Sequence, residues 1–156
     1  YLVQVDTPER LLAHPHTLQV AKLMAAPALN LVTLEDSAVL PVGCELAIRA
    51  TALCPVAADA AHSLPVQVLG SRHLVGGMLY RARLLEAVSL PLESGRASAD
   101  SELSARMYAR VRAGQELEFF IPDAQGGASL SVGDRVHLGV AAERCFLFSK
   151  GKRFYL

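Results

Sequence analysis

The sequence predicts a mainly β fold, a small antiparallel barrel or sandwich preceded by two short helices. Apolar residues recur at helical spacing only within the first thirty residues, and from Asn30 onwards they alternate with polar residues at a period of two. Glycine-containing turns separate the alternating segments at fairly regular intervals. With 156 residues, of which 52% are hydrophobic, the chain is long enough to form one domain with its own core.

Two helix starts stand close together near the beginning of the sequence. Asp6 or Thr7 can cap a first helix, and the proline that follows fits the first helical position. A second proline limits this helix to about two turns, residues 8–13. A second helix begins at Thr17 and ends before Pro27. Two short helices joined by a proline corner are therefore expected.

The remainder of the chain contains eight short segments with the period of a half-buried strand. They are residues 31–34, 45–49, 66–69, 77–85, 105–111, 116–121, 135–140 and 145–148. The stretch from Leu90 to Glu102 is rich in Ser, Ala, Gly and charged residues, which is typical of a surface loop. Eight strands with regular turns favour an antiparallel barrel or a sandwich.

Charge and cysteine content exclude several classes of function. Fifteen Lys and Arg balance fifteen Asp and Glu, so the chain lacks the field that attracts nucleic acid or an anionic membrane. No apolar stretch approaches the ~20 residues of a membrane-spanning helix. An odd number of cysteines, three, argues against a disulfide framework and favours a reducing compartment such as the cytoplasm.

The residue types of a catalytic or metal site occur without the spacing that the chemistry needs. No phosphate-binding loop of the form GxxxxGK[ST] is present. His14 and His16 provide two ligands where a tetrahedral metal needs four, so both are interpreted as polar residues of the helix corner. Cys44, Cys54 and Cys145 lie in or beside apolar strands and are interpreted as small buried hydrophobes.

Three further groups of polar residues deserve an interpretation. Ser71, His73 and Asp134 supply the types of a catalytic triad, but no nucleophile elbow surrounds the serine. Ser71-Arg72 after Gly70 is a candidate anion site, and an ordinary polar turn is the simpler reading. A basic strand face, read as solvated, comprises Arg106, Tyr108, Arg110 and Arg112. The sequence therefore predicts no catalytic, cofactor-binding or metal-binding residue.

Three segments near the start carry a resemblance to a known family. They read QVDTPERLLAHP (4–15), VAKLM (20–24) and PALN (27–30). Together they resemble the pattern QxGTPxxLYxxP, VAxF and GxPxxN at the end of the nucleotide-binding domain of ABC importer ATPases, without a gap. The sequence departs from the pattern at Asp6, Leu12, Leu23 and Ala25. Each of these four residues is compatible with two short helices joined by a proline corner.

Two later segments are similar to the same family. GCELAIR (43–49) resembles a strand that continues there into an RPE signature, whereas here Arg49 is followed by Ala50 and Thr51. VGDRV (132–136) and ERCFLF (143–148) resemble the GDxV strand and ERCxLF ending of the sugar and glycerol-phosphate members. The maltose, glycerol-phosphate and sugar-type branch is thus the most similar.

The resemblance implies a C-terminal regulatory and dimerisation domain with an OB-like (TOBE) barrel, which follows an ATPase domain in the same polypeptide. It divides the chain into the last helices of a truncated nucleotide-binding domain (1–30), the barrel (31–148) and a tail (149–156). The start at Tyr1, without an initiator methionine, agrees with a piece of a longer protein. This fragment is then no enzyme and holds no cofactor, whereas the parent ATPase would bind ATP and Mg²⁺.

The implied partners follow from the transporter assembly. They are a second ATPase subunit, the integral-membrane permease subunits reached through the parent ATPase, and a regulatory protein, with no nucleic acid and no direct membrane insertion. The implied location is the cytoplasmic face of the bacterial plasma membrane. The alternative is a stand-alone barrel that binds a small oxyanion such as molybdate or sulfate. A single-strand nucleic-acid-binding barrel is the weakest reading, because only 6% of the residues are aromatic.

Overall fold

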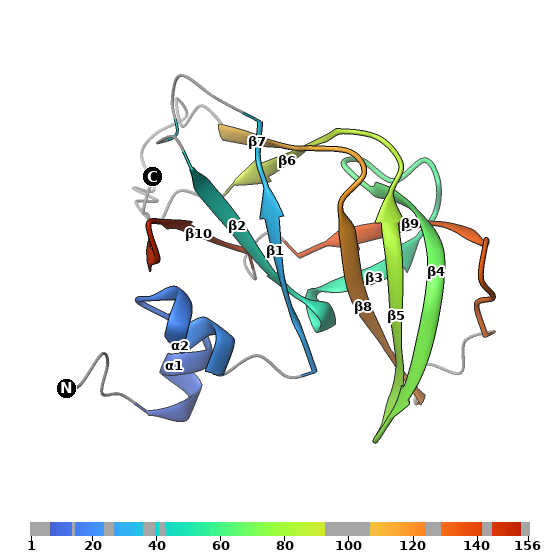
Figure 1. The fold of residues 1–156 in the computed structure, drawn as a ribbon, viewed down its shortest axis with the longest axis horizontal. Helices are drawn as coiled ribbons and strands as arrows, with labels where there is room; N and C mark the ends of the chain where they lie inside the picture. Colours follow the sequence, from blue (N-terminus) through green and yellow to red (C-terminus); the bar gives the residue numbers. More distant parts are fainter. Residues whose placement is uncertain are drawn as a thin grey trace.

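The computed structural model describes residues 7–13, 15–23, 27–35, 40, 43–92, 107–123, 129–141 and 145–153. Its described part is mainly β, with antiparallel sheets and only short helices, as the sequence predicts (Figure 1). Strand pairing among these residues forms three sheets and does not close into a barrel. None of the helices in these ranges is long and apolar enough to cross a membrane.

Both predicted helices are present and begin with a threonine cap. They are α1 (Pro8–Ala13) and α2 (Leu18–Leu23). The Thr7 hydroxyl accepts a hydrogen bond from the Arg10 amide at 3.4 Å, and the Thr17 hydroxyl accepts one from the Val20 amide at 3.2 Å. These bonds satisfy N–H groups that a helix start leaves without a partner. Asp6, the other candidate cap, lies outside the described residues.

A four-stranded antiparallel sheet lies next to the helices. Its order is β1 (Leu29–Thr33), β2 (Cys44–Arg49), β10 (Cys145–Ser149) and β11 (Lys152–Arg153). The last pair is a hairpin whose two turn residues, Lys150 and Gly151, both have positive φ, of 51° and 81°. Such a two-residue turn matches the natural twist of a hairpin. Residues 152 and 153, part of the predicted tail, thus form a strand.

A five-stranded antiparallel sheet forms the other end of the molecule (Figure 1). Its order is β3 (Leu53–Val56), β9 (Arg135–Val140), β4 (Leu64–Leu74), β5 (Gly77–Leu84) and β8 (Glu116–Pro122). A short 3₁₀ helix, η1 (Ala50–Ala52), leads from β2 into β3. The remaining pair, β6 (Val88–Leu92) and β7 (Met107–Val111), touches the first sheet through a bridge between Leu34 and Val111.

Besides β11, two further strands in the described ranges were not expected from the sequence, and each of these two contains a proline. β3 includes Pro55, and β6 includes Pro91. Each strand pairs on one side only among the described residues, and an edge is where a strand tolerates proline. The prediction of a loop is wrong for Leu90 to Leu92, which belong to β6, and residues 93–102 lie outside the described part.

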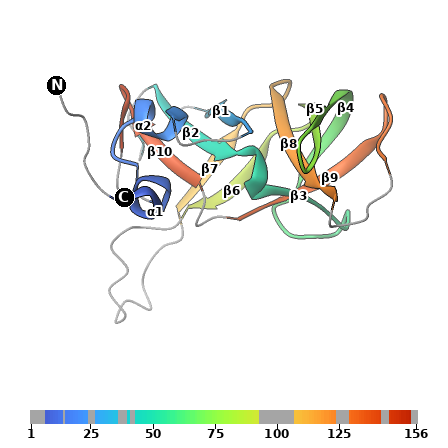
Figure 2. The same ribbon diagram turned by 90° about the horizontal axis from the view of Figure 1, so that it is seen from below.

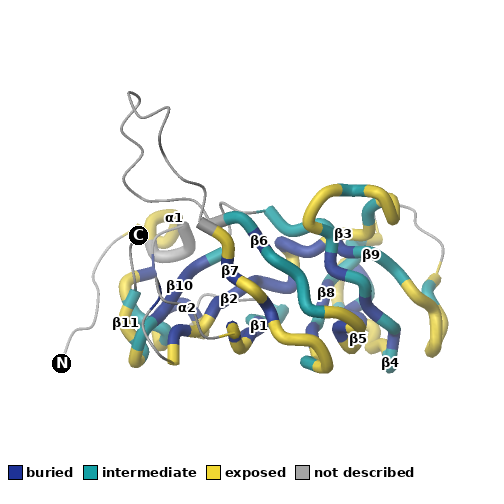
Figure 3. The backbone as a smooth tube through the Cα atoms, turned by 90° about the horizontal axis from the view of Figure 1, so that it is seen from above, coloured by how far each residue is buried: buried dark blue, intermediate teal, exposed yellow. Residues whose placement is uncertain are grey.

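One main core joins all three sheets. Its largest fully buried members include Leu46 and Ile48 of β2, Val66 of β4 and Phe119 of β8, and Val111 of β7 is also part of it. Residues that alternate along each strand point into this core, which is why the period of two marks most strands correctly. Figure 3 shows the buried positions along β2 and β10.

A second, smaller cluster lies on the opposite face of the four-stranded sheet, beneath the helices. It contains Ala21 of α2, Ala47 of β2 and Phe146 and Phe148 of β10. Backbone hydrogen bonds from Leu18 to Gly151 (2.8 Å) and from Arg153 to His16 (2.9 Å) join the helical segment to the β10–β11 hairpin. Figure 2 shows both helices at this end of the molecule. The division of the chain at residue 30 stays a prediction.

Two side-chain amides connect the backbone of β1 to that of β8, or β1 to the turn before β8. Asn30 of β1, only 7% exposed, donates to the Glu118 carbonyl at 2.8 Å and accepts from the Glu118 amide at 2.7 Å. Gln115 does the same for Thr33: its Oε1 accepts from the Thr33 amide at 2.7 Å and its Nε2 donates to the Thr33 carbonyl at 2.9 Å. The Asn30 amide therefore takes the place of a strand neighbour for Glu118, whereas the Thr33 carbonyl also accepts a hydrogen bond from the Arg112 amide at 3.3 Å.

Candidate functional site

A hollow on β4, β5 and β8 is a candidate ligand site. Its volume is about 260 Å³, and it is lined by Gly70, Ser71, Arg72, Leu79, Arg81 and Glu118. A bulge between Val68 and Gly70 shifts the register of β4, so that Gly70 lies opposite Arg81. At Gly70 a Cβ would meet only the Arg81 guanidinium, at 3.9 Å. The missing side chain therefore leaves space at the bulge.

The hollow combines one buried apolar residue with charged groups. Leu79 is 4% exposed, whereas Ser71, Arg72 and Arg81 are exposed. Within the described part of the chain, no hydrogen bond or ion pair engages the side chain of Arg72 or Arg81. Arg83, the next outward residue of β5, differs because it lies 3.9 Å from the Glu116 carboxylate. Two available guanidinium groups thus share the hollow with one carboxylate, that of Glu118.

The structure brings the predicted candidate pair together with residues that the sequence did not indicate. Ser71 and Arg72 after Gly70 do line the hollow, next to Arg81 and Glu118. The alternation of β5 could have indicated Arg81 as an outward residue. Its position beside Gly70 depends on the bulge, and a bulge leaves no reliable mark in a single sequence.

Ser71, His73 and Asp134, which supply the residue types of a catalytic triad, do not form a catalytic arrangement in the described residues. Ser71 and His73 are both exposed on β4. The Asp134 carboxylate accepts a hydrogen bond from the Ser131 amide at 2.7 Å within its own turn. In the described residues no hydrogen bond joins any two of the three side chains, so the arrangement offers no activated nucleophile.

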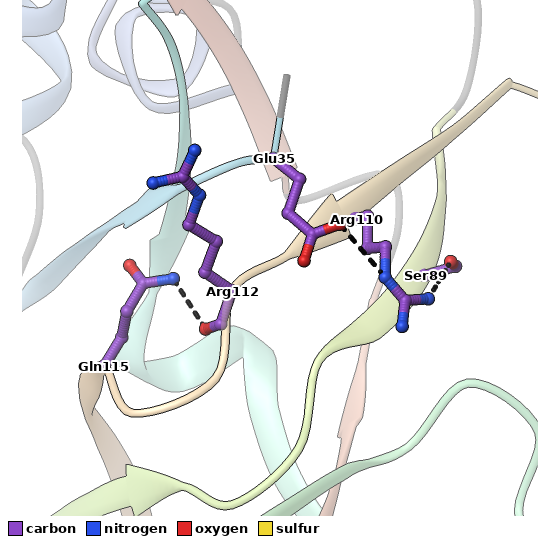
Figure 4. Close-up of polar contacts among 5 residues, drawn as sticks. All are labelled: Glu35, Ser89, Arg110, Arg112 and Gln115. Atoms are coloured by element: carbon purple, nitrogen blue, oxygen red, sulfur yellow. Dashed lines mark hydrogen bonds and ion pairs between the residues drawn. The ribbon is translucent and has the colours of Figure 1, made fainter. Parts of the chain in front are cut away.

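The predicted basic face is partly neutralised. Tyr108 and Arg110 point outward from β7 and are exposed, as expected for a solvated strand face. Arg110 forms an ion pair with Glu35 at 3.1 Å and donates to the Ser89 hydroxyl at 3.4 Å (Figure 4). Arg112 is exposed, its carbonyl accepting from Gln115 at 2.8 Å. Arg106 lies outside the described residues.

The histidine and cysteine candidates form no metal centre in the ranges that the structure covers. His16 is exposed and its carbonyl accepts from the Arg153 amide, while His14 lies outside those ranges. None of the three cysteines forms a disulfide within the described residues: Cys44 is buried, Cys145 is half-buried and Cys54 is exposed. The buried interpretation is therefore wrong for Cys54, which lies on the edge strand β3.

Burial changes the chemistry of Cys44. Desolvation, and secondarily the charge of Glu45, raise the pKa of its thiol, although a backbone hydrogen bond at Glu45 opposes them. A raised pKa keeps the sulfur protonated and poorly nucleophilic at neutral pH. Cys44 is thus a core residue of β2.

Comparison of the chain with known proteins gave no match, either to a family model or to a curated protein. The arguments for its function therefore come from its own residues and from the resemblance described above.

Proposed function

We propose that the chain is a non-catalytic C-terminal regulatory and dimerisation domain of the ATP-binding subunit of an ABC importer for a sugar, glycerol-phosphate or related solute. The observation that carries the proposal is the gapless resemblance of residues 4–30. Asn30 is the last residue of that segment. Its side chain forms two hydrogen bonds with the backbone of Glu118, 88 residues away, and so connects β1 to β8. Thr7 and Pro8, which lie in the same segment, likewise begin a helix.

The architecture supports this proposal. In the proposed OB-like (TOBE) arrangement, β1 and β8 would face each other across a seam bridged by the amide of Asn30. A scaffold of packed strands, without a metal cluster or an activated nucleophile in its described residues, suits a rigid contact domain. Its partners would be a second ATPase subunit, the permease subunits through the parent ATPase, and a regulatory protein, at the cytoplasmic face of the membrane. Such a domain would bias ATPase opening and closing from a distance.

The coding sequence upstream of the Tyr1 codon tests the proposal most directly. We expect it to encode a phosphate-binding loop and an LSGGQ segment in the same reading frame. If it encodes neither, the proposal is wrong.

Sedimentation of the 156-residue chain tests the dimerisation role separately. We expect weak self-association, because much of the dimer contact would come from the ATPase domain. A tight dimer at nanomolar concentration would contradict that expectation.

A second candidate function rests on the hollow at Gly70. Its two available guanidinium groups and the Ser71 hydroxyl favour a stand-alone module that binds a small oxyanion such as molybdate or sulfate. Calorimetric titration of the chain with each anion tests this function, and the absence of heat with both would exclude it.

A further inference from the structure

We propose that the hollow beside Gly70 binds a phosphate monoester of a small polyol. Such a ligand carries a dianionic group, several hydroxyl groups and a short carbon body. The inference goes beyond the role of an accessory domain, because it adds a small-molecule site that the importer resemblance does not supply.

The phosphate group is selected by the two arginines. The guanidinium of arginine offers a planar fork of donors that matches two phosphate oxygens, and Arg72 and Arg81 both line the hollow. A phosphate monoester has a second pKa near 6 and is mostly dianionic at neutral pH, so it is attracted by the two guanidinium groups, which outnumber the single carboxylate of the lining. The Ser71 hydroxyl adds a further donor at the same place.

Both guanidinium groups are available without breaking an existing interaction. No ion pair engages Arg72 or Arg81 among the described residues, whereas Arg110 is held by Glu35 at 3.1 Å. A ligand at Arg110 would have to compete with that carboxylate. Binding at the hollow displaces no ion pair of this kind, although the Glu118 carboxylate lies opposite Arg81 in the same lining. This difference favours the hollow over the basic face of β7.

The size and the remaining lining select an organic ester over an inorganic anion. A hollow of about 260 Å³ has room for a ligand larger than sulfate or molybdate, each of which has five heavy atoms. The Glu118 carboxylate would repel a second anion but accepts hydrogen bonds from hydroxyl groups. Leu79 offers an apolar surface for the carbon body.

Isothermal titration of the full chain with ribose 5-phosphate, at low ionic strength and pH 7.5, tests the proposal. We expect saturable binding, with free ribose and inorganic phosphate each at least tenfold weaker. Arg72→Gln and Arg81→Gln should each weaken binding at least tenfold. Gly70→Leu fills the hollow without changing its charge, and the backbone of Gly70 is not left-handed, so this variant should fold and lose binding.

Arg83→Gln is the matched control, because Arg83 lies on the same face of β5 but outside the hollow. It should change the affinity less than twofold, and a loss equal to that of Arg81→Gln would overturn the proposal by indicating attraction to surface charge in general. Absence of binding at millimolar ribose 5-phosphate would also overturn it. Equal or tighter binding of sulfate, molybdate or inorganic phosphate would assign the hollow to inorganic oxyanions instead. The importer proposal is tested by the coding sequence upstream of the Tyr1 codon, and none of these binding results affects that test. The two proposals can therefore fail separately.

Discussion

At the helix-covered end of the molecule, two arginines pack against one phenylalanine, whereas at the opposite end two arginines line an open hollow. The guanidinium carbons of Arg49 and Arg153 lie 5.0 and 4.4 Å from the centre of the Phe146 ring. Arg72 and Arg81 are exposed and have no ring contact among the described residues. An arginine side chain therefore contributes to the fold where an aromatic ring packs against its guanidinium, and is available to a ligand where no ring does.

The two amide bridges repeat this contrast on a smaller scale. Asn30 and Gln115 each exchange two hydrogen bonds with one residue of an opposing strand. The bonds of Asn30 are part-buried, while those of Gln115 are exposed to solvent. The Gln115 amide also donates to the Arg112 carbonyl at 2.8 Å, and this bond too is exposed. Because water can replace a lost partner only at exposed bonds, Gln115 should contribute less to stability than Asn30 although it forms more bonds.

Phe146→Ala should produce the largest loss in the free energy of unfolding, about 3–5 kcal/mol. Phe146 is 2% exposed and shares its cluster with Ala21, Ala47 and Phe148, so truncation leaves a cavity and removes the ring beneath two guanidinium groups. Chemical denaturation measures the change. Phe120→Ala at the opposite end is the control, since Phe120 is only half-buried, and an equal loss there would contradict the contrast between the two ends.

Asn30→Ala should follow, with a loss of about 2–3 kcal/mol, because the Glu118 amide and carbonyl would lose their part-buried partners. Gln115→Ala should cost less than about 1 kcal/mol, since water replaces its exposed bonds. Both values come from urea unfolding of the two variants under the same conditions. A larger loss for Gln115→Ala than for Asn30→Ala would show that burial does not set the contribution of these bridges.

Local chemistry explains which parts of the fold the sequence predicts. Thr7 and Thr17 are caps whose signal lies within one turn of the chain, and both helices begin where these residues indicate. The segment 77–85 alternates from Tyr80 to Leu84 and becomes β5 at almost the expected bounds. Pro55 and Pro91 argue against a strand when only the sequence is known, so β3 and β6 were not predicted. The sheet order shows that both strands lie at edges, where proline is tolerated.

The candidate site could be predicted only in part, for the same physical reason. Ser71 and Arg72 stand next to Gly70 in the sequence, so this half of the hollow is local. Arg81 and Glu118 join it through the pairing of β4 with β5 and of β5 with β8, and the bulge after Val68 sets the register. Pairings between distant strands depend on the packed core as a whole and leave no signature at the residues themselves.

Cys44 should make stability depend on alkaline pH. Burial raises the pKa of its thiol in the folded chain, so above the ordinary value of about 9.0 the unfolded chain loses this proton first. The contribution is therefore complete below that pH and is lost as pH rises through the folded value. The slope attributable to one proton is at most about 1.4 kcal/mol per pH unit.

Urea unfolding of the chain and of Cys44→Ala between pH 8 and pH 10.5 measures this contribution. The variant lacks the titrating thiol, and its stability should fall less steeply over this window. Cys54→Ala is the matched control, because Cys54 is exposed, and it should retain the slope of the original chain. Parallel curves for the original chain and Cys44→Ala would show that burial of this thiol has no effect on the pH dependence.

The smallest effect on stability is expected from the double variant Arg72→Gln with Arg81→Gln. Both side chains are exposed and have no ion pair in the described residues, so the free energy of unfolding should change by less than about 0.5 kcal/mol. For a chain of this size that corresponds to a shift in Tm of about 1–2 °C. The same variant should lose the binding of ribose 5-phosphate, which separates a ligand site from a structural pair. A loss of stability comparable to that of Asn30→Ala would mean that these arginines, like Arg49 and Arg153, serve the fold.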